Sequence, residues 1–128
     1  MATRRILFGL LAAFPLFGGG AIAAEMPYDP AAFEAAQKAG KPILVHITAP
    51  WCTTCAAQKP ILSKLEAEPK FKDLQVFDVD FDSRKDVVKQ FSATMQSTLI
   101  TYKGAKETGR SAGETKPEAI SSLLDKAI

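Results

Sequence analysis

The alternation of strand-like and helix-like segments constrains the fold of this chain more than any other feature. Short apolar or β-branched runs alternate with segments whose apolar residues recur at helical spacing. Strands are predicted over 43–47, 74–81, 98–103 and 108–111, and helices are predicted to follow residues 29, 52, 83 and 115. This order predicts parallel β-α-β units closed by an antiparallel hairpin, which is an α/β fold with a central mixed β-sheet flanked by helices.

Individual residues predict where these helices begin and end. Asp29, followed by proline, predicts an N-cap, and Gly40 predicts the end of the same helix. Ser83, with an acidic residue three positions later, resembles a capping box, and Thr115 is expected to cap the last helix. Pro60 lies inside the second helix and is expected to bend it, because proline has no N–H to donate.

The N-terminal segment has the three parts of a secretory signal. Arg4 and Arg5 precede an apolar stretch of 12 residues, and residues 21–23 place small side chains where a signal peptidase cleaves. We therefore expect a signal peptide at 1–23 and a mature domain at 24–128, in the periplasm of a bacterium. An uncleaved membrane anchor is the alternative, but 12 apolar residues are fewer than the roughly 20 that span a bilayer.

Charge and cysteine content exclude several classes of protein. The chain has 16 basic and 14 acidic residues, and without the two arginines of the expected signal the numbers are equal. A domain without excess positive charge is not built to bind nucleic acid. Two cysteines are too few for a disulfide-dense scaffold or for a structural zinc site made only of thiolates.

The two cysteines stand three residues apart, where a predicted strand gives way to a helix. Residues at this spacing lie on one face of a helical turn, so Cys52 and Cys55 can form a disulfide. The positive end of the helix lowers the pKa of a thiol placed there, which predicts Cys52 as the exposed nucleophile and Cys55 as the more buried resolving thiol. A static structural disulfide is one alternative, although so short a loop gains little stability from a bridge. Metal binding by the two thiolates is another.

The wider pattern around these cysteines resembles the thioredoxin family. The resemblance covers residues 29–128 and rests on the strand 43–47, the motif Trp51-Cys52-Thr53-Thr54-Cys55, Pro60, Gly104 and Gly113. It implies a thioredoxin fold and reversible dithiol–disulfide exchange with protein substrates through Cys52 and Cys55, with no bound cofactor and no metal. Trp51, Thr53, Thr54 and Ser97 are the residues that this resemblance places around the site.

The export signal and the Gly40-Lys41-Pro42 sequence look most like periplasmic thioredoxin-like reductases. This likeness implies a reductant of protein disulfides that draws electrons from a membrane thiol conduit of the Dsb or cytochrome c maturation type. We expect a monomer. A disulfide oxidase or isomerase is an alternative, because the dipeptide between the cysteines does not set a potential. A periplasmic copper-binding module using the same cysteines and a redox-inert binding domain are others.

Two positions depart from the family pattern in ways that bear on chemistry. Ser97 stands where the family has a cis proline, and we expect a trans peptide bond here because a cis bond before a non-proline residue is costly. We expect Ser97 near the cysteines, with an ordinary loop serine as the alternative. His46, six residues before Cys52, replaces a buried carboxylate. The hypothesis is that His46 transfers protons for Cys55, oriented or charged by Asp78, with a satisfied core histidine as the alternative.

The remaining features predict less specific roles. The family often has a second tryptophan near the site, and Thr48 stands at that position here. We expect Trp51 to form part of an apolar collar around Cys52. Asp78, Asp80 and Asp82 alternate along a predicted strand, which places them on one face. A solvated face, or one acid buried near the histidine, is favoured there over a metal site.

Overall fold

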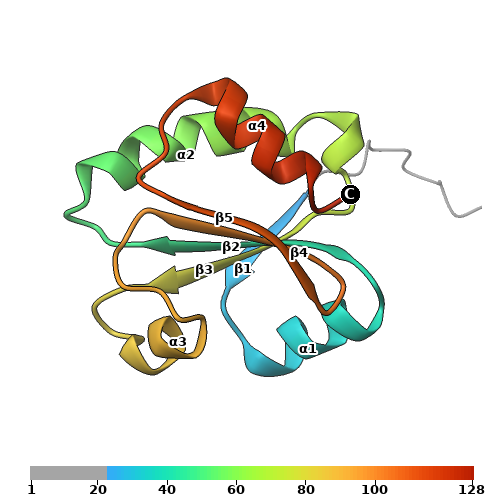
Figure 1. The fold of residues 1–128 in the computed structure, drawn as a ribbon, viewed down its shortest axis with the longest axis horizontal. Coiled ribbons are helices and arrows are strands. Elements are labelled where there is room, and N and C mark those ends of the chain that lie inside the picture. The colour runs from blue at the N-terminus through green and yellow to red at the C-terminus, as the bar shows by residue number, and fades with distance from the viewer. Residues whose placement is uncertain (1–22) are drawn as a thin grey trace, which may run out of the picture.

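The computed structural model describes residues 23–128, which form a five-stranded sheet between two layers of helices (Figure 1). The strands are β1 (Ala24–Pro27), β2 (Pro42–Thr48), β3 (Gln75–Asp80), β4 (Thr98–Lys103) and β5 (Lys106–Ala112). The helices are α1 (Pro30–Lys38), α2 (Thr53–Glu66), α3 (Lys85–Gln90) and α4 (Pro117–Asp125), with a short 3-10 turn η1 (Pro69–Phe71). Among the described residues, no helix is both long and apolar enough to cross a membrane.

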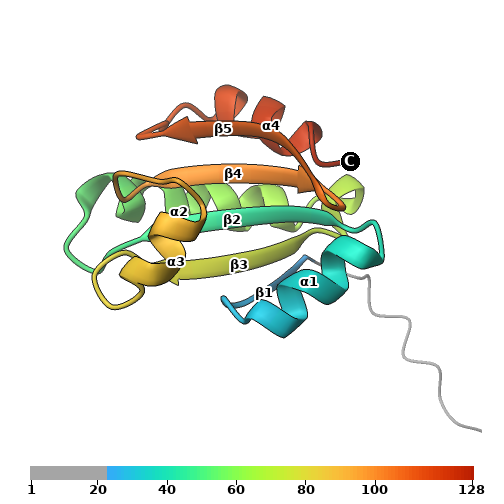
Figure 2. The same ribbon diagram turned by 60° about the horizontal axis from the view of Figure 1, so that its bottom comes forward.

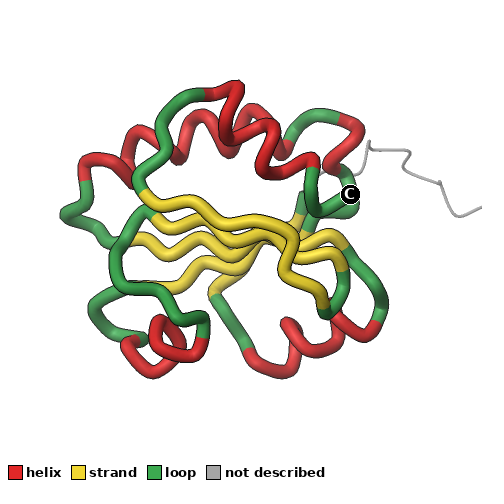
Figure 3. The backbone as a smooth tube through the Cα atoms, in the orientation of Figure 1, coloured by secondary structure: helices red, strands yellow, loops and turns green. Residues whose placement is uncertain are grey.

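The sheet is mixed, in the order β1-β3-β2-β4-β5. β1, β3 and β2 run parallel, whereas β4 is antiparallel to β2, and β5 is antiparallel to β4. Helices α2 and α4 cover one face, and α1 and α3 cover the other; the tube in Figure 3 shows the same layers, and the rotated view in Figure 2 separates the five strands. The fold is the thioredoxin fold that the sequence predicts.

The predicted element order lacked one strand. β1 has only four residues, and its pairing partner lies about 50 positions later, with Ala24 opposite Gln75. Such an edge strand has too few residues for an alternating pattern, and its partner lies far away in the chain. The expected signal peptide lies outside the described residues except for Ala23, which is buried and immediately precedes β1.

The predicted limits of α1 are confirmed. The carboxylate of Asp29 accepts a hydrogen bond of 2.9 Å from the N–H of Ala32, which is the N-cap arrangement. Helix α1 ends at a C-cap on Ala39, and Gly40 follows with φ of +69°, a backbone conformation that favours glycine.

The predicted caps of α3 and α4 are wrong. The N-caps are Arg84 and Lys116, one residue later than predicted, and neither makes a side-chain capping bond. The N–H of Ser83 is instead bonded to Asp80, in the turn that ends β3. The carboxylate of Glu114 accepts the N–H groups of both residues ahead of α4, at 3.1 and 2.9 Å. In both places a neighbouring acid accepts N–H groups of the turn that precedes the helix.

Alternation along the central strands divides the core into two halves. On β2, Ile43, Val45 and Ile47 pack on the side of α1 and α3, together with an aromatic cluster. Leu44 packs on the opposite side, against α2 and α4. Successive side chains of a strand point to opposite faces, so His46 shares the face of Leu44 and lies under α2. This alternation places the side chain of His46 beneath α2, the helix that carries the cysteines.

Candidate redox site

Cys52 and Cys55 form a disulfide at the N-terminus of α2, with their Cα atoms 5.2 Å apart. Strand β2 ends at Thr48, and Cys52 is the N-cap of the helix that follows. The N–H of Cys55 donates to the Sγ of Cys52 at 3.0 Å. When the disulfide is reduced, this donor and the positive end of the helix favour a thiolate at Cys52. The predicted junction between strand and helix is confirmed.

The expectation that Cys52 is exposed is wrong for the disulfide form. Cys52 is 5% exposed and Cys55 is fully buried, so the predicted ranking of the two is correct but the difference is small. Ala49 and the partly buried Phe81 pack against the pair. These two residues cover the sulfurs because the β2–α2 connection and the end of β3 meet at the same edge of the sheet.

Trp51 does not form the predicted apolar collar. Its side chain is 58% exposed, and its indole N–H donates a hydrogen bond of 2.6 Å to the carboxylate of Asp82. Asp82 is itself held in a turn, because its N–H donates to the carboxylate of Asp80. Trp51 is thus a surface ring attached to the loop after β3, while Ala49 and Phe81 provide the apolar contacts.

The three aspartates do not share one face of a strand. β3 ends at Asp80, whose exposed carboxylate closes the following turn, and Asp82 lies beyond the strand. The carboxylate of Asp80 accepts hydrogen bonds from backbone N–H groups, above all that of Ser83, and these bonds lower its pKa. Only Asp78 faces the histidine. Within residues 23–128, no group of three or more His, Cys, Asp or Glu side chains is placed to hold a metal ion.

Ser97 lies just before β4, at the same end of the sheet as the disulfide, since the next residue pairs with Ile47 of β2. It is buried, and its peptide bonds are trans, as are all others in the described part of the chain. Its φ is +59°, and its hydroxyl donates to the carbonyl of Gln96 rather than to a sulfur. Proline, with φ near −65°, cannot adopt this backbone. The departure from the family therefore involves the main chain as well as the side chain.

His46 and Asp78 lie together, as the sequence predicts for neighbouring strands. They occupy paired positions on β2 and β3, with Nδ1 of the histidine 3.7 Å from Oδ1 of the aspartate. That separation is longer than a hydrogen bond. Burial lowers the pKa of His46, and a hydrogen bond of 3.1 Å between its Nε2 and Oε1 of Gln58 acts in the opposite direction. The bonded partner of the ring is therefore Gln58, three residues after Cys55.

The pair opens into a polar cavity of about 250 Å³ beneath α2. Three further charged side chains line this cavity, namely Glu25, Lys59 and Glu66. Burial, followed by a hydrogen bond and repulsion from Glu25, raises the pKa of Asp78 to about 8. Burial and the same neighbour raise the pKa of Glu66 to about 7. At neutral pH the aspartate therefore holds a proton and the histidine is neutral, so the pair has no net charge.

Sequence reasoning missed three residues of this region. Glu25 belongs to β1, the strand that the sequence did not reveal. Gln58 and Glu66 lie on α2, three and eleven positions after Cys55. Both offsets correspond to nearly whole helical turns, so this periodicity could have placed them on the face of the resolving cysteine.

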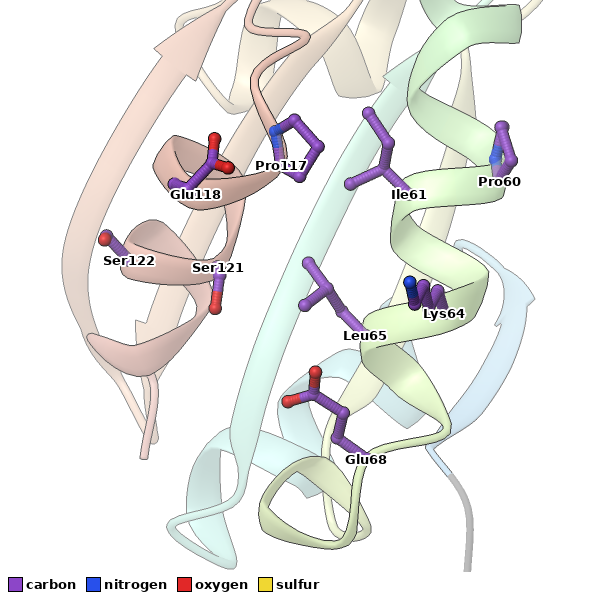
Figure 4. A pocket seen from close by; sticks show the side chains of 9 residues that line it. All are labelled: Pro60, Ile61, Lys64, Leu65, Glu68, Pro117, Glu118, Ser121 and Ser122. Atoms are coloured by element: carbon purple, nitrogen blue, oxygen red, sulfur yellow. The ribbon is translucent and has the colours of Figure 1, made fainter.

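A second, larger hollow lies elsewhere on the molecule. A groove of about 620 Å³ separates α2 from α4, and Figure 4 shows Ile61 of α2 facing Pro117 of α4 across it, with Leu65 facing Ser121 one turn further along. Neither cysteine lines the groove, and neither does His46. The redox chemistry of this fold belongs to the N-terminal end of α2 and not to this groove.

A dithiol pair at the start of a helix, on a mixed sheet of this order, defines a thiol–disulfide oxidoreductase. The family model described as Thioredoxin matches residues 26–126. An H-type thioredoxin of Fagopyrum esculentum is 32% identical over 88 residues, covering 69% of this chain and 74% of the relative. A thioredoxin of Chlamydia trachomatis is 32% identical over 84 residues, covering 66% and 80%.

The comparison of structures agrees with the comparison of sequences. The crystal structure of Trxlp from Edwardsiella tarda superimposes with a TM-score of 0.77 at 46% identity, covering 79% of this chain and 98% of that one. The chain belongs to the thioredoxin family. Proteins of this family act on protein disulfides and need no cofactor beyond their redox cysteines, which here are Cys52 and Cys55.

Proposed function

We propose that this protein is an exported reductant of protein disulfides, working as a monomer in the bacterial periplasm. The observation that carries the proposal is the N–H of Cys55 donating to the Sγ of Cys52 at the positive end of α2. This arrangement favours a nucleophilic thiolate at the first cysteine. Export is inferred from the signal-like pattern of residues 1–23, and the reducing direction from the likeness to periplasmic reductases.

The reaction has two exchange steps. The thiolate of Cys52 attacks one sulfur of the substrate disulfide, which forms a mixed disulfide and releases the other substrate sulfur as a thiolate. Cys55 then loses its proton and attacks the Sγ of Cys52, which expels the second substrate sulfur. Two electrons pass to the substrate, its two sulfurs take up protons, and the protein is left with the Cys52–Cys55 disulfide. A membrane thiol conduit restores the dithiol by the reverse exchange.

The second step needs a group that accepts the proton of Cys55. We assign this task to the neutral ring of His46, which lies with the protonated Asp78 under the same helix and opens into the polar cavity. The cavity is large enough to hold ordered water beside the pair, and Cys55 lies on the same helix that covers it. Substituting His46 by alanine should change the pH dependence of disulfide reduction, and an unchanged profile would refute this assignment.

Two measurements test the direction and the mechanism. The reduction potential of the pair should lie near that of thioredoxin, about −270 mV, and a value near the −120 mV of DsbA would identify an oxidase instead. In an insulin reduction assay, Cys55→Ser should accumulate a mixed disulfide visible on a non-reducing gel. Cys52→Ser is the matched control and should trap nothing, because the attacking sulfur is absent.

Export is tested separately in cells. The full chain, produced in a Gram-negative host, should be recovered from the periplasmic fraction with the mass of residues 24–128. Recovery of the intact chain from the membrane fraction would identify an anchored protein, and recovery from the cytoplasm would refute export.

A further inference from the structure

Gln58 is a buried side chain that connects three separate parts of the redox site. It lies on α2, one turn after Cys55, and is fully buried. Its Oε1 is 3.1 Å from Nε2 of His46, and its Nε2 donates to the carbonyl oxygens of Ser97 at 3.1 Å and Glu114 at 2.9 Å. Glutamine is seldom buried, and this one joins β2, the segment before β4 and the segment before α4.

The partners of this amide fix its orientation. Carbonyl oxygens can only accept hydrogen bonds, so the amide group that faces Ser97 and Glu114 must be the NH₂. The amide oxygen therefore faces His46, and an amide oxygen also only accepts. The Nε2 atom of His46 must then carry a hydrogen. Since burial lowers the pKa of His46, the ring is neutral at pH 7 and its Nδ1 has a free lone pair.

We propose that Gln58 is a positioning residue of the redox centre, which holds His46 in the Nε2–H tautomer and confines its proton exchange to Nδ1. The Nδ1 atom lies 3.7 Å from the carboxyl group of Asp78. The other charged groups that face this region are Glu25 from β1 and Lys59 and Glu66 from α2, while β4 contributes the apolar Leu99 opposite the histidine.

This arrangement lets a proton enter and leave without moving the site. A histidine protonated at Nδ1 keeps its Nε2–H, so the hydrogen bond to Gln58 is the same in both protonation states. The bonds from Gln58 to the carbonyls of Ser97 and Glu114 are then also unchanged. The role in exchange rests on the proposed function, in which His46 accepts the proton of Cys55. The tautomer itself does not depend on that function.

Nuclear magnetic resonance can determine the tautomer directly. The chain has one histidine, so in the full chain labelled with ¹⁵N-histidine the ring signals belong to His46 without further assignment. Above the pKa of about 8 of Asp78, the wild type should show a protonated Nε2 and a bare Nδ1. In Gln58→Leu nothing accepts from Nε2–H, whereas ionised Asp78 accepts from Nδ1–H, so the Nδ1–H form should become the major one.

Two further variants make the result specific. Gln58→Glu should keep the Nε2–H tautomer, because a buried protonated carboxyl accepts from Nε2–H with its C=O and donates its O–H to the carbonyl of Ser97 or Glu114. If Gln58→Leu does not fold, the tautomer of His46 in Gln58→Glu tests the proposal. Gln90→Leu is the control, because Gln90 is an exposed helical glutamine that donates to the hydroxyl of Tyr28, which belongs to the opposite core cluster. It should leave the tautomer unchanged.

The outcomes separate the two proposals. An Nδ1–H tautomer in the wild type, or an unchanged Nε2–H tautomer in folded Gln58→Leu at alkaline pH, would overturn the role of Gln58. An Nδ1–H tautomer in folded Gln58→Glu would overturn it as well. If the tautomers behave as expected but the pH profile of disulfide reduction is identical in wild type and Gln58→Leu, the assignment of Gln58 stands and the proton role of His46 falls.

Discussion

Replacing Asp78 by asparagine tests whether the cavity keeps this carboxyl group protonated. The side chain is 30% exposed and lies 3.7 Å from His46, and its pKa is raised from 3.8 to about 8, chiefly by burial. The unfolded chain releases this proton near the ordinary value, whereas the folded protein holds it until about pH 8. Asparagine has a similar shape but cannot titrate.

The sign and size of the effect follow from the two pKa values. A group whose pKa is raised by folding contributes stability that is complete below its unfolded pKa and lost as the pH rises through its folded pKa. Over this window the free energy of unfolding falls by at most about 1.4 kcal/mol per pH unit for one proton. Solvent screening of the partly exposed carboxyl reduces this slope to roughly half of its maximum. Between about pH 5 and pH 8 the wild type should therefore lose about 2 kcal/mol relative to Asp78→Asn.

Urea unfolding of the oxidised proteins, followed by far-ultraviolet circular dichroism at a series of pH values, measures this difference. Asp80→Asn is the matched control on the same strand, because the pKa of Asp80 is lowered and its carboxylate accepts N–H groups of the turn. That variant should lose stability relative to wild type as the pH rises through the ordinary range of an aspartate. Parallel curves for wild type and Asp78→Asn between pH 5 and pH 8 would refute a protonated Asp78.

Three further substitutions test the packing and the backbone. Leu99→Ala should lower the free energy of unfolding by about 2–5 kcal/mol in urea titrations, because it removes a fully buried side chain from the α2 side of the core. Asp29→Ala should lower it by about 1 kcal/mol through loss of the α1 cap, whereas Asp29→Asn should retain most of it. Ser97→Pro should lower the thermal midpoint because φ is +59°, and Ser97→Gly, which accepts this φ, should not. A proline variant as stable as wild type would contradict the left-handed backbone at this position.

Local patterns were sufficient for the main elements of the fold and for the chemistry of the cysteines. Apolar runs identified β2, β3 and β4, and the spacing of Cys52 and Cys55 identified the start of α2. These features depend on residues only a few positions apart, and their geometry follows from the periodicity of helices and strands. The positions of His46 and Asp78 in the family pattern also made their juxtaposition predictable.

The surroundings of the disulfide depended on contacts between distant segments. Trp51 was expected against the sulfurs, but a hydrogen bond to Asp82, 31 residues away, holds it at the surface. The caps of α3 and α4 lie one residue later than predicted, and neighbouring acids accept N–H groups of the turns ahead of both helices. No short-range pattern shows which acceptor a given N–H will find when several lie within reach.

The sequence alone determined an α/β fold with a dithiol at the start of a helix, because both conclusions rest on local spacing, and the resemblance of its motifs implied the thioredoxin fold. Only the tertiary structure decided what surrounds that dithiol. Strand β1 brings Glu25 to the cavity, and Gln58 meets segments that lie 39 and 56 residues away along the chain. The protonation of His46 and Asp78 depends on this burial and these partners, since the free energy of a charge is set by the groups packed around it.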